Sequence, residues 1–166
     1  MKKTGVASLI ILAVTLSQAT SLNKPAPKFA LANSQKQTRT LSSYRGKVVF
    51  INFWASWCAP CQEELPELSR LADDYRGKKV AVVAINVDQD RRAAKKLLAK
   101  LGLSASHMEI LWDPKSKVVS AYNIETMPSS FILDAHGLIR FTHVGYHSQD
   151  PQAWRQEVES LLNKAP

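Results

Sequence analysis

Cysteine is scarce in this chain, which has only Cys58 and Cys61 in 166 residues. With 45% hydrophobic residues, a domain of this length can bury a sufficient core without a structural disulfide. A bridge across two intervening residues would also remove little entropy from the unfolded chain. We therefore expect the two thiols to carry chemistry, and a stable structural bridge is the less favoured alternative.

The sequence also lacks the ligands of a recognisable metal or haem site. Zinc would need two ligands besides the cysteines. The four histidines stand at no recognisable spacing from them: His107, His136, His143 and His147. No Cys-x-x-Cys-His motif occurs, so the chain is not itself a c-type haem carrier. We expect no metal and no cofactor, and a metal-binding or chaperone-like module using the cysteines only as ligands stays open as an alternative.

No hydrophobic run reaches the roughly 20 residues that a membrane-spanning helix requires. The first residues instead resemble an export signal, with Lys2 and Lys3, an apolar core over Val6–Leu16, and the small residues of Ser17–Ala19. We predict a signal peptide over residues 1–19, cleaved after Ala19 and followed by an extended lead-in over 20–27. An uncleaved membrane anchor is the alternative. No cysteine lies nearby for lipid attachment.

An excess of acidic residues is absent too, since the whole chain carries a net charge of +8. Removing Lys2 and Lys3 leaves 20 basic and 14 acidic side chains, a net charge of +6. Five of the basic residues fall on one expected helix, where they are typical of a solvated face: Arg91, Arg92, Lys95, Lys96 and Lys100. Because no aromatic interleaving or nucleic-acid motif accompanies them, we expect no nucleic-acid partner.

The pattern of apolar residues predicts a βαβ unit preceded by a short hairpin. The strand Val48–Trp54 is an almost unbroken apolar run, as expected for a strand covered on both faces. The helix Ala59–Tyr75 and the strand Val80–Val87 follow, and a right-handed crossover would make the two strands parallel. Upstream, Phe29–Leu31 and Thr38–Leu41 flank a polar turn and indicate the hairpin.

The second half changes to an antiparallel pattern. The strands Ser129–Leu133 and Leu138–Val144 are separated by a turn short enough for a hairpin. Asp150 and Pro151 indicate the cap and first turn of a closing helix. Three shorter elements are expected before the hairpin: a helix over Arg91–Leu101, a strand over Ile110–Trp112 and a helix over Lys115–Tyr122. No internal repeat interrupts this α/β sandwich.

The run Trp57–Cys61 places both thiols where the buried strand gives way to the first helix. Unpaired N–H groups and the positive end of the helix dipole favour a thiolate there, so Cys58 is the predicted nucleophile. It would attack a partner disulfide, and Cys61, one turn later and more enclosed, would attack Cys58 to release the reduced partner. The reverse steps oxidise a partner, so the motif does not indicate the direction.

This arrangement resembles the thioredoxin superfamily, and within it the exported TlpA-like and ResA-like thiol-disulfide oxidoreductases. The residues that carry the likeness are Asn52–Cys61, Glu64, Pro66, Met127-Pro128 and Ser129–Asp134. The resemblance implies a thioredoxin-like three-layer sandwich over residues 28–166, with a central mixed sheet, the antiparallel hairpin, the C-terminal helix and an extra N-terminal hairpin.

The resemblance also implies roles for residues outside the Cys-x-x-Cys motif. Cytosolic thioredoxins carry an aspartate where this chain has Asn52, and ResA-like proteins have a glutamate at the position of Glu64. Glu64 is therefore expected to tune thiol pKa values and accept the Cys61 proton, unless it is an exposed glutamate that only stabilises the helix. Pro128 is expected to be cis, with the Met127 backbone pairing with substrate. Trp57 is expected to border the site.

The expected function is reduction of disulfides in other exported proteins of the periplasm through a reversible Cys58–Cys61 disulfide. Resemblance implies re-reduction by a membrane electron donor and suggests cytochrome c maturation as one substrate route. An oxidant that introduces disulfides would use the same residues. A peroxiredoxin shares the fold but carries a threonine or serine three residues before its reactive cysteine, where this chain has Ala55.

Overall fold

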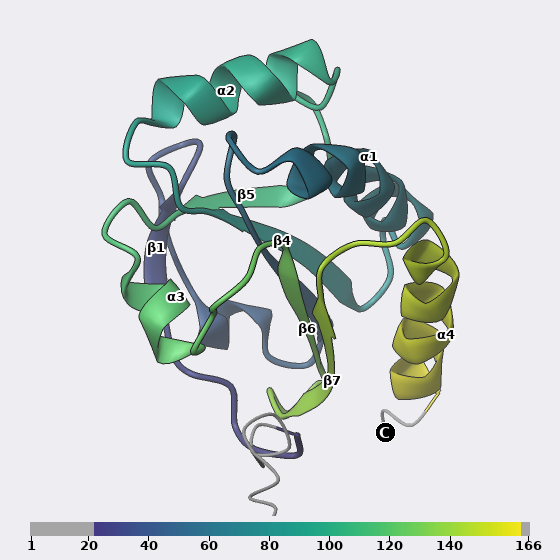
Figure 1. Ribbon diagram of the computed structural model, residues 1–166. Coiled ribbons are helices and arrows are strands. Elements are labelled where there is room, and N and C mark those ends of the chain that lie inside the picture. The colour runs from purple at the N-terminus through teal and green to yellow at the C-terminus, as the bar shows by residue number, and fades with distance from the viewer. Residues whose placement is uncertain (1–21, 164–166) are drawn as a thin grey trace, which may run out of the picture.

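A seven-stranded mixed sheet forms the centre of the protein. The computed structural model describes residues 22–163 (Figure 1), so the predicted signal peptide lies outside the described residues. The strands are ordered β2-β1-β5-β4-β3-β6-β7 across the sheet. Within residues 22–163, no helix is long and apolar enough to cross a membrane.

The predicted βαβ unit forms the middle of the sheet. β3 (Val48–Trp54) and β4 (Val80–Asn86) are parallel and are connected by α1 (Ala59–Asp74). All seven residues of β3 are buried, which explains its continuous apolar sequence. β6 (Ser129–Leu133) runs antiparallel to β3, and β7 (Ile139–Val144) runs antiparallel to β6. The predicted hairpin is confirmed.

The extra N-terminal hairpin is also present, with shifted ends. β1 (Ala30–Asn33) begins one residue later than expected, and β2 (Thr38–Thr40) ends before Leu41, which opens the short 3-10 helix η1 (Leu41–Tyr44). The carbonyl oxygen of the Asn33 side chain accepts the N–H groups of Gln35 and Gln37 and so shapes the turn. β1 pairs antiparallel with β5 (Glu109–Trp112), which joins the hairpin to the main sheet.

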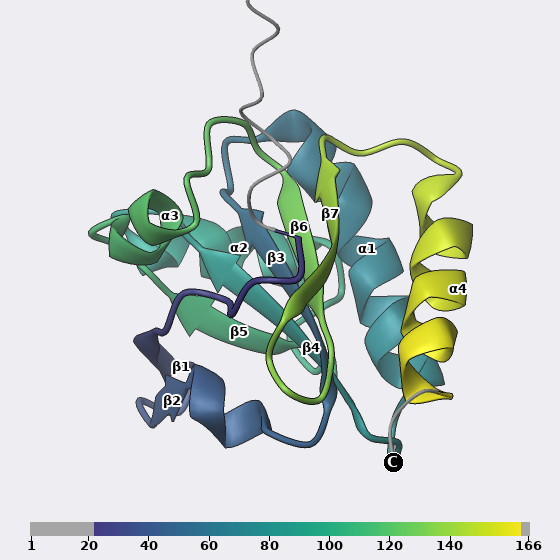
Figure 2. The ribbon, with the colours of Figure 1, turned by 90° about the horizontal axis from the view of Figure 1, so that it is seen from below.

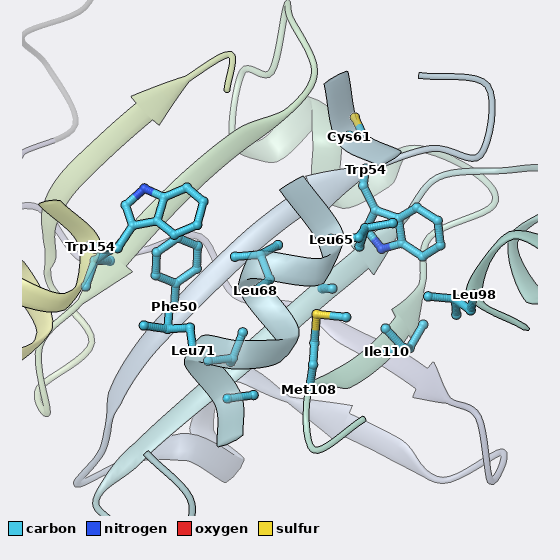
Figure 3. Packing of buried hydrophobic residues seen from close by; sticks show 14 of the residues in the cluster. Phe50, Trp54, Cys61, Leu65, Leu68, Leu71, Leu98, Met108, Ile110 and Trp154 are labelled. Atoms are coloured by element: carbon cyan, nitrogen blue, oxygen red, sulfur yellow. The ribbon is translucent and has the colours of Figure 1, made fainter. Parts of the chain in front are cut away.

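Helices cover both faces of the sheet (Figure 2). α1, α2 (Arg91–Lys100) and α4 (Asp150–Leu162) pack on the face that receives Phe50 and Trp54 from β3. α3 (Lys117–Ala121) and η1 pack on the other face, which receives Ile51 and Phe53. Figure 3 shows the first of these cores, with Trp154 beside Phe50 and with Cys61 next to Trp54. The three-layer α/β sandwich is thereby confirmed.

Two helices begin at positions different from those expected. Asp150 is the first residue of α4 and not its cap, because its carboxylate accepts the N–H of His147 outside the helix, at 2.7 Å, and Gln149 occupies the cap position. α3 begins at Lys117 and not at Lys115. The Asp113 carboxylate fixes this start by accepting the N–H groups of Lys117, Val118 and Val119.

The N-terminal lead-in pairs with the end of the β6–β7 turn and with the first residue of β7. The Asn23 N–H donates to the Ile139 carbonyl at 2.7 Å, and the Ile139 N–H donates to the Lys24 carbonyl at 2.9 Å. The Ala26 N–H then donates to the Gly137 carbonyl at 3.0 Å. The sequence predicted an extended segment here but no partner for it.

Candidate active site

The two cysteines form a disulfide at the N-terminus of α1. Their sulfur atoms are 2.03 Å apart and their Cα atoms 5.3 Å apart. Cys58 is the cap residue of α1, and its sulfur accepts the N–H of Cys61 at 3.3 Å. Cys58 retains 6% exposure whereas Cys61 has none. A partner sulfur therefore reaches Cys58 first, and the helix N–H supports a thiolate there.

Trp57 is the most exposed large apolar residue beside this disulfide. Its side chain is 72% exposed, whereas Trp54, three residues earlier, is fully buried at the end of β3. An exposed indole next to the reactive cysteine provides apolar surface that a partner protein can cover.

The Met127–Pro128 peptide bond is cis and lies at the start of β6. Because Ser129 pairs with Phe53, this segment lies beside the end of β3 that leads into the cysteine motif. Met127 packs against the same hydrophobic cluster that contains both cysteines. Pro128 accepts the N–H of Gly145 through its carbonyl at 2.8 Å. No other residue in 22–163 hydrogen-bonds to the Met127 N–H or C=O, which leaves them available to an extended peptide.

Glu64 is buried, with 1% exposure, so the alternative of an exposed, purely helix-stabilising glutamate does not hold. It stands one turn after Cys61 in α1. The Asn52 Nδ2 donates to Glu64 Oε2 at 2.8 Å and to Ser130 Oγ at 3.0 Å. Burial raises the pKa of Glu64 to about 8, and the Asp150 charge also raises it, against the opposing effect of the Asn52 and Ser130 hydrogen bonds. The carboxyl is therefore mostly protonated at neutral pH.

Sequence reasoning missed several polar residues of this region. Ser130 lies opposite Asn52 in the β3–β6 register and contributes to the same buried polar group. Asn86 ends β4, Asp88 lies two residues later, and both are buried at the carboxyl end of this strand. The sequence carried a signal for them, because the carboxyl ends of neighbouring parallel strands meet at one edge of a sheet.

The histidines do not assemble a metal centre in the part of the chain that the structure describes. No group of three or more histidine, cysteine, aspartate or glutamate side chains converges within residues 22–163. His143 Nε2 lies 2.7 Å from Glu157 Oε2, and His107 Nδ1 lies 2.5 Å from Asp73 Oδ1. The first pair connects β7 to α4, the second connects the segment before β5 to α1, and neither contains a cysteine.

Comparisons with known proteins agree with this geometry. The sequence model of the AhpC/TSA family matches residues 22–142. The chain is 33% identical over 126 residues to the thiol-disulfide oxidoreductase ResA of Geobacillus kaustophilus, covering 76% of this chain and 71% of that protein. It is 36% identical over 120 residues to the thioredoxin-like protein YneN of Bacillus subtilis, covering 72% and 69%.

A solved structure supports the same assignment. The crystal structure of a protein from Chlorobium tepidum, named thiol:disulfide interchange protein DsbE, superposes with a TM-score of 0.78 at 33% identity, covering 85% of this chain and 97% of that one. The sheet order, the disulfide at the start of α1 and these similarities agree with one another. The chain belongs to the thioredoxin-like AhpC/TSA family and is a thiol-disulfide oxidoreductase similar to ResA.

Proposed function

We propose that the protein reduces disulfides of other exported proteins in the periplasm. The observation that supports the exchange chemistry is the full burial of the resolving Cys61 one turn from Glu64, whose pKa is raised by burial to about 8. The reducing direction and the periplasmic location are proposed from the resemblance to ResA-like proteins. An ordinary thiol has a pKa of about 8.5, so in the minor fraction of molecules whose Glu64 is ionised at neutral pH the proton of Cys61 can pass to its carboxylate at little cost.

The reaction then proceeds by two exchanges. The Cys58 thiolate attacks one sulfur of the partner disulfide and releases the other as a thiolate, which leaves a mixed disulfide. Cys61 gives its proton to Glu64, and its thiolate attacks the Cys58 sulfur. The Cys58–Cys61 disulfide forms, and the partner leaves with two electrons. The free backbone of Met127 and the exposed Trp57 provide the contacts that align the partner.

Turnover requires a reductant because each cycle ends with the Cys58–Cys61 disulfide. We propose a membrane electron donor for this step and oxidised apocytochrome c as one substrate. Both proposals rest on the resemblance to ResA-like proteins.

A trapping experiment tests the exchange and identifies both partners. Full-length Cys61→Ser, expressed in the producing cell, should accumulate mixed disulfides on Cys58, and the matched Cys58→Ser variant should accumulate none. The trapped proteins should include an exported dithiol protein and a membrane protein. Absence of any adduct in an expressing cell would argue against the exchange.

The direction of electron flow has its own measurement. Equilibration with a thiol buffer should give a reduction potential well below the roughly −120 mV of a strong periplasmic oxidant. A value near that figure would instead support the introduction of disulfides.

N-terminal sequencing of the exported protein should find Thr20 first, whereas a chain that still begins at Met1 would support an anchor.

A further inference from the structure

A buried carboxylate outside the cysteine motif holds the backbone of the segment that leads to Cys58. Asp88, at 5% exposure, lies just beyond the end of β4. Its Oδ1 and Oδ2 accept the N–H of Ser56 at 3.2 and 3.0 Å. Ser56 is two residues before Cys58, in the connection between β3 and α1.

Asn86 fixes Asp88 on the sheet. The Asn86 Nδ2 donates to Asp88 Oδ2 at 2.9 Å, and the Asp88 N–H donates to Asn86 Oδ1 at 3.1 Å. Asn86 is fully buried and pairs with Trp54 on one side and Trp112 on the other. The Asp88 carboxylate is thus held next to a residue that is paired on both sides within the sheet.

The carbonyl group of Ser56 is held from the opposite side. Gln62 Nε2, in α1, donates to the Ser56 carbonyl at 2.9 Å. The Cys58 N–H donates to the Ala55 carbonyl at 3.2 Å and closes the turn. Trp57 projects into solvent and contributes little packing of its own, so these bonds determine where the turn lies.

We propose that Asp88 is a positioning residue of thiol-disulfide exchange, which fixes Ser56 and through it places Trp57 and the Cys58 sulfur against an incoming disulfide. Exchange needs the attacking sulfur in line with the disulfide that it breaks, so a fixed turn lowers the entropic cost of reaching that geometry. Asp88 touches neither sulfur, and its effect passes through one backbone N–H.

Two substitutions of Asp88 that both remove its charge distinguish an effect on the position of the Ser56 backbone from an effect of the charge. Asp88→Asn keeps an oxygen that can accept the Ser56 N–H, whereas Asp88→Ala keeps none. Leaving the Ser56 N–H without its acceptor should lower kcat/KM for a disulfide substrate about tenfold in Asp88→Ala relative to Asp88→Asn. Asp88→Asn should stay within about threefold of the native protein, because it retains an acceptor. Asp90→Ala is the control, since Asp90 is exposed and, among residues 22–163, its carboxylate hydrogen-bonds to Arg92 and not to Ser56.

Equal kcat/KM values for Asp88→Ala and Asp88→Asn would overturn the proposal, because charge alone would then account for any change. The rate of alkylation of reduced Cys58 should follow the same order, since that readout does not depend on substrate affinity. Thermal unfolding identifies a variant that fails to fold.

If Asp88→Ala does not fold, Gln62→Ala tests the same segment by removing the hydrogen bond to the Ser56 carbonyl. It should lower kcat/KM at least about threefold relative to the exposed control Gln152→Ala, and an unchanged value would contradict the proposal.

Discussion

The side-chain amide of Asn52 donates a hydrogen bond to the buried carboxyl group of Glu64 across a distance of 2.8 Å. Asn52 faces α1 because side chains alternate along β3, which places Phe50, Asn52 and Trp54 on one face. The pair thus connects the central strand to the helix that carries both cysteines. A neutral amide can stabilise either protonation state of Glu64 without adding charge of its own.

Glu64→Gln should flatten the dependence of stability on pH. A carboxyl whose folded pKa of about 8 lies above its ordinary value of 4.5 stabilises the fold fully below the lower value and loses this contribution as pH rises through the upper one. The native protein should therefore lose stability between about pH 5 and 8, by roughly 1.4 kcal/mol per unit of effective shift. Urea unfolding across this range measures it. Glu63→Gln, on the exposed neighbour, should leave the native slope unchanged.

The ionisation of Glu64 should also appear in the kinetics of thiol-disulfide exchange. If ionised Glu64 accepts the proton of Cys61, the rate at which Cys61 resolves a mixed disulfide should rise with pH and show an inflection near the Glu64 pKa of about 8. Glu64→Gln should remove that inflection and slow resolution about tenfold or more, whereas the first attack by Cys58 changes little. Stopped-flow kinetics with a disulfide peptide resolves the two steps. An unchanged pH-rate profile would assign Glu64 a structural role.

Asn52→Asp should make the protein sensitive to alkaline pH. Two carboxyl groups would then face each other in a buried site, and both cannot ionise without strong repulsion. We expect a loss of about 3 kcal/mol near pH 8, mostly recovered near pH 5 where both groups are protonated. Chemical unfolding at the two pH values checks this. Ser130→Ala removes a neighbouring hydrogen bond without adding charge, so an equal pH dependence in that variant would contradict the explanation.

Trp57→Ala should impair substrate binding without weakening the fold. The indole is 72% exposed, so its loss should change the free energy of unfolding by less than about 0.5 kcal/mol. If a partner covers it, KM for a protein disulfide should rise about tenfold, with a smaller effect on a low-molecular-weight disulfide. Leu22→Ala is the matched control, because Leu22 is also an exposed apolar residue, at 43%, but lies next to the Asn23–Ile139 pairing. Equal effects on both substrates would contradict a docking role.

Trp154→Ala should be the opposite case, with a large cost to stability. Trp154 is fully buried in α4, and its ring packs edge-on against Phe50 of β3 with centroids 5.2 Å apart. Truncation of such a side chain costs about 3–5 kcal/mol. Thermal and urea unfolding measure the loss, with the exposed Gln156→Ala on the same helix expected to lie within about 0.5 kcal/mol of the native protein. A small cost for Trp154→Ala would show that this face of the core can rearrange.

The sequence predicted the elements with strong local patterns. The apolar run Val48–Trp54 and the short turn at 134–137 between two strand segments depend only on neighbouring residues. β3 and β6 formed where expected, and β7 begins at Ile139, one residue after the predicted Leu138. The pairing of β1 with β5 could not be read in this way, because it joins short segments far apart in the chain. The same holds for the lead-in, which is too short to show a period of its own.

The residues of the candidate site also fall into those that a local sequence pattern indicates and those that depend on tertiary packing. The Cys-x-x-Cys spacing indicated the reactive pair directly, since its chemistry requires the two thiols to lie one turn apart. The burial of Glu64 depends on how α1 is rotated against β3, which no local pattern determines. Asp88 was overlooked because an aspartate after a strand reads as an ordinary turn residue. The predicted pairing of β3 with β4 places Asp88 near the cysteine motif, and the structure adds that its carboxylate accepts the Ser56 N–H.

The pairing of the lead-in with the start of β7 fills hydrogen-bonding groups that another chain could otherwise use. An uncovered strand edge offers free N–H and C=O groups to any extended chain, including another copy of the same protein. Asn23–Ala26 occupy this edge beside Gly137–Ile139, and Pro25 has no N–H of its own to offer outward. The end of β7 near Val144, next to Pro128, has no such cover among residues 22–163. The lead-in thus covers the start of this sheet edge, and the edge stays accessible beside the disulfide.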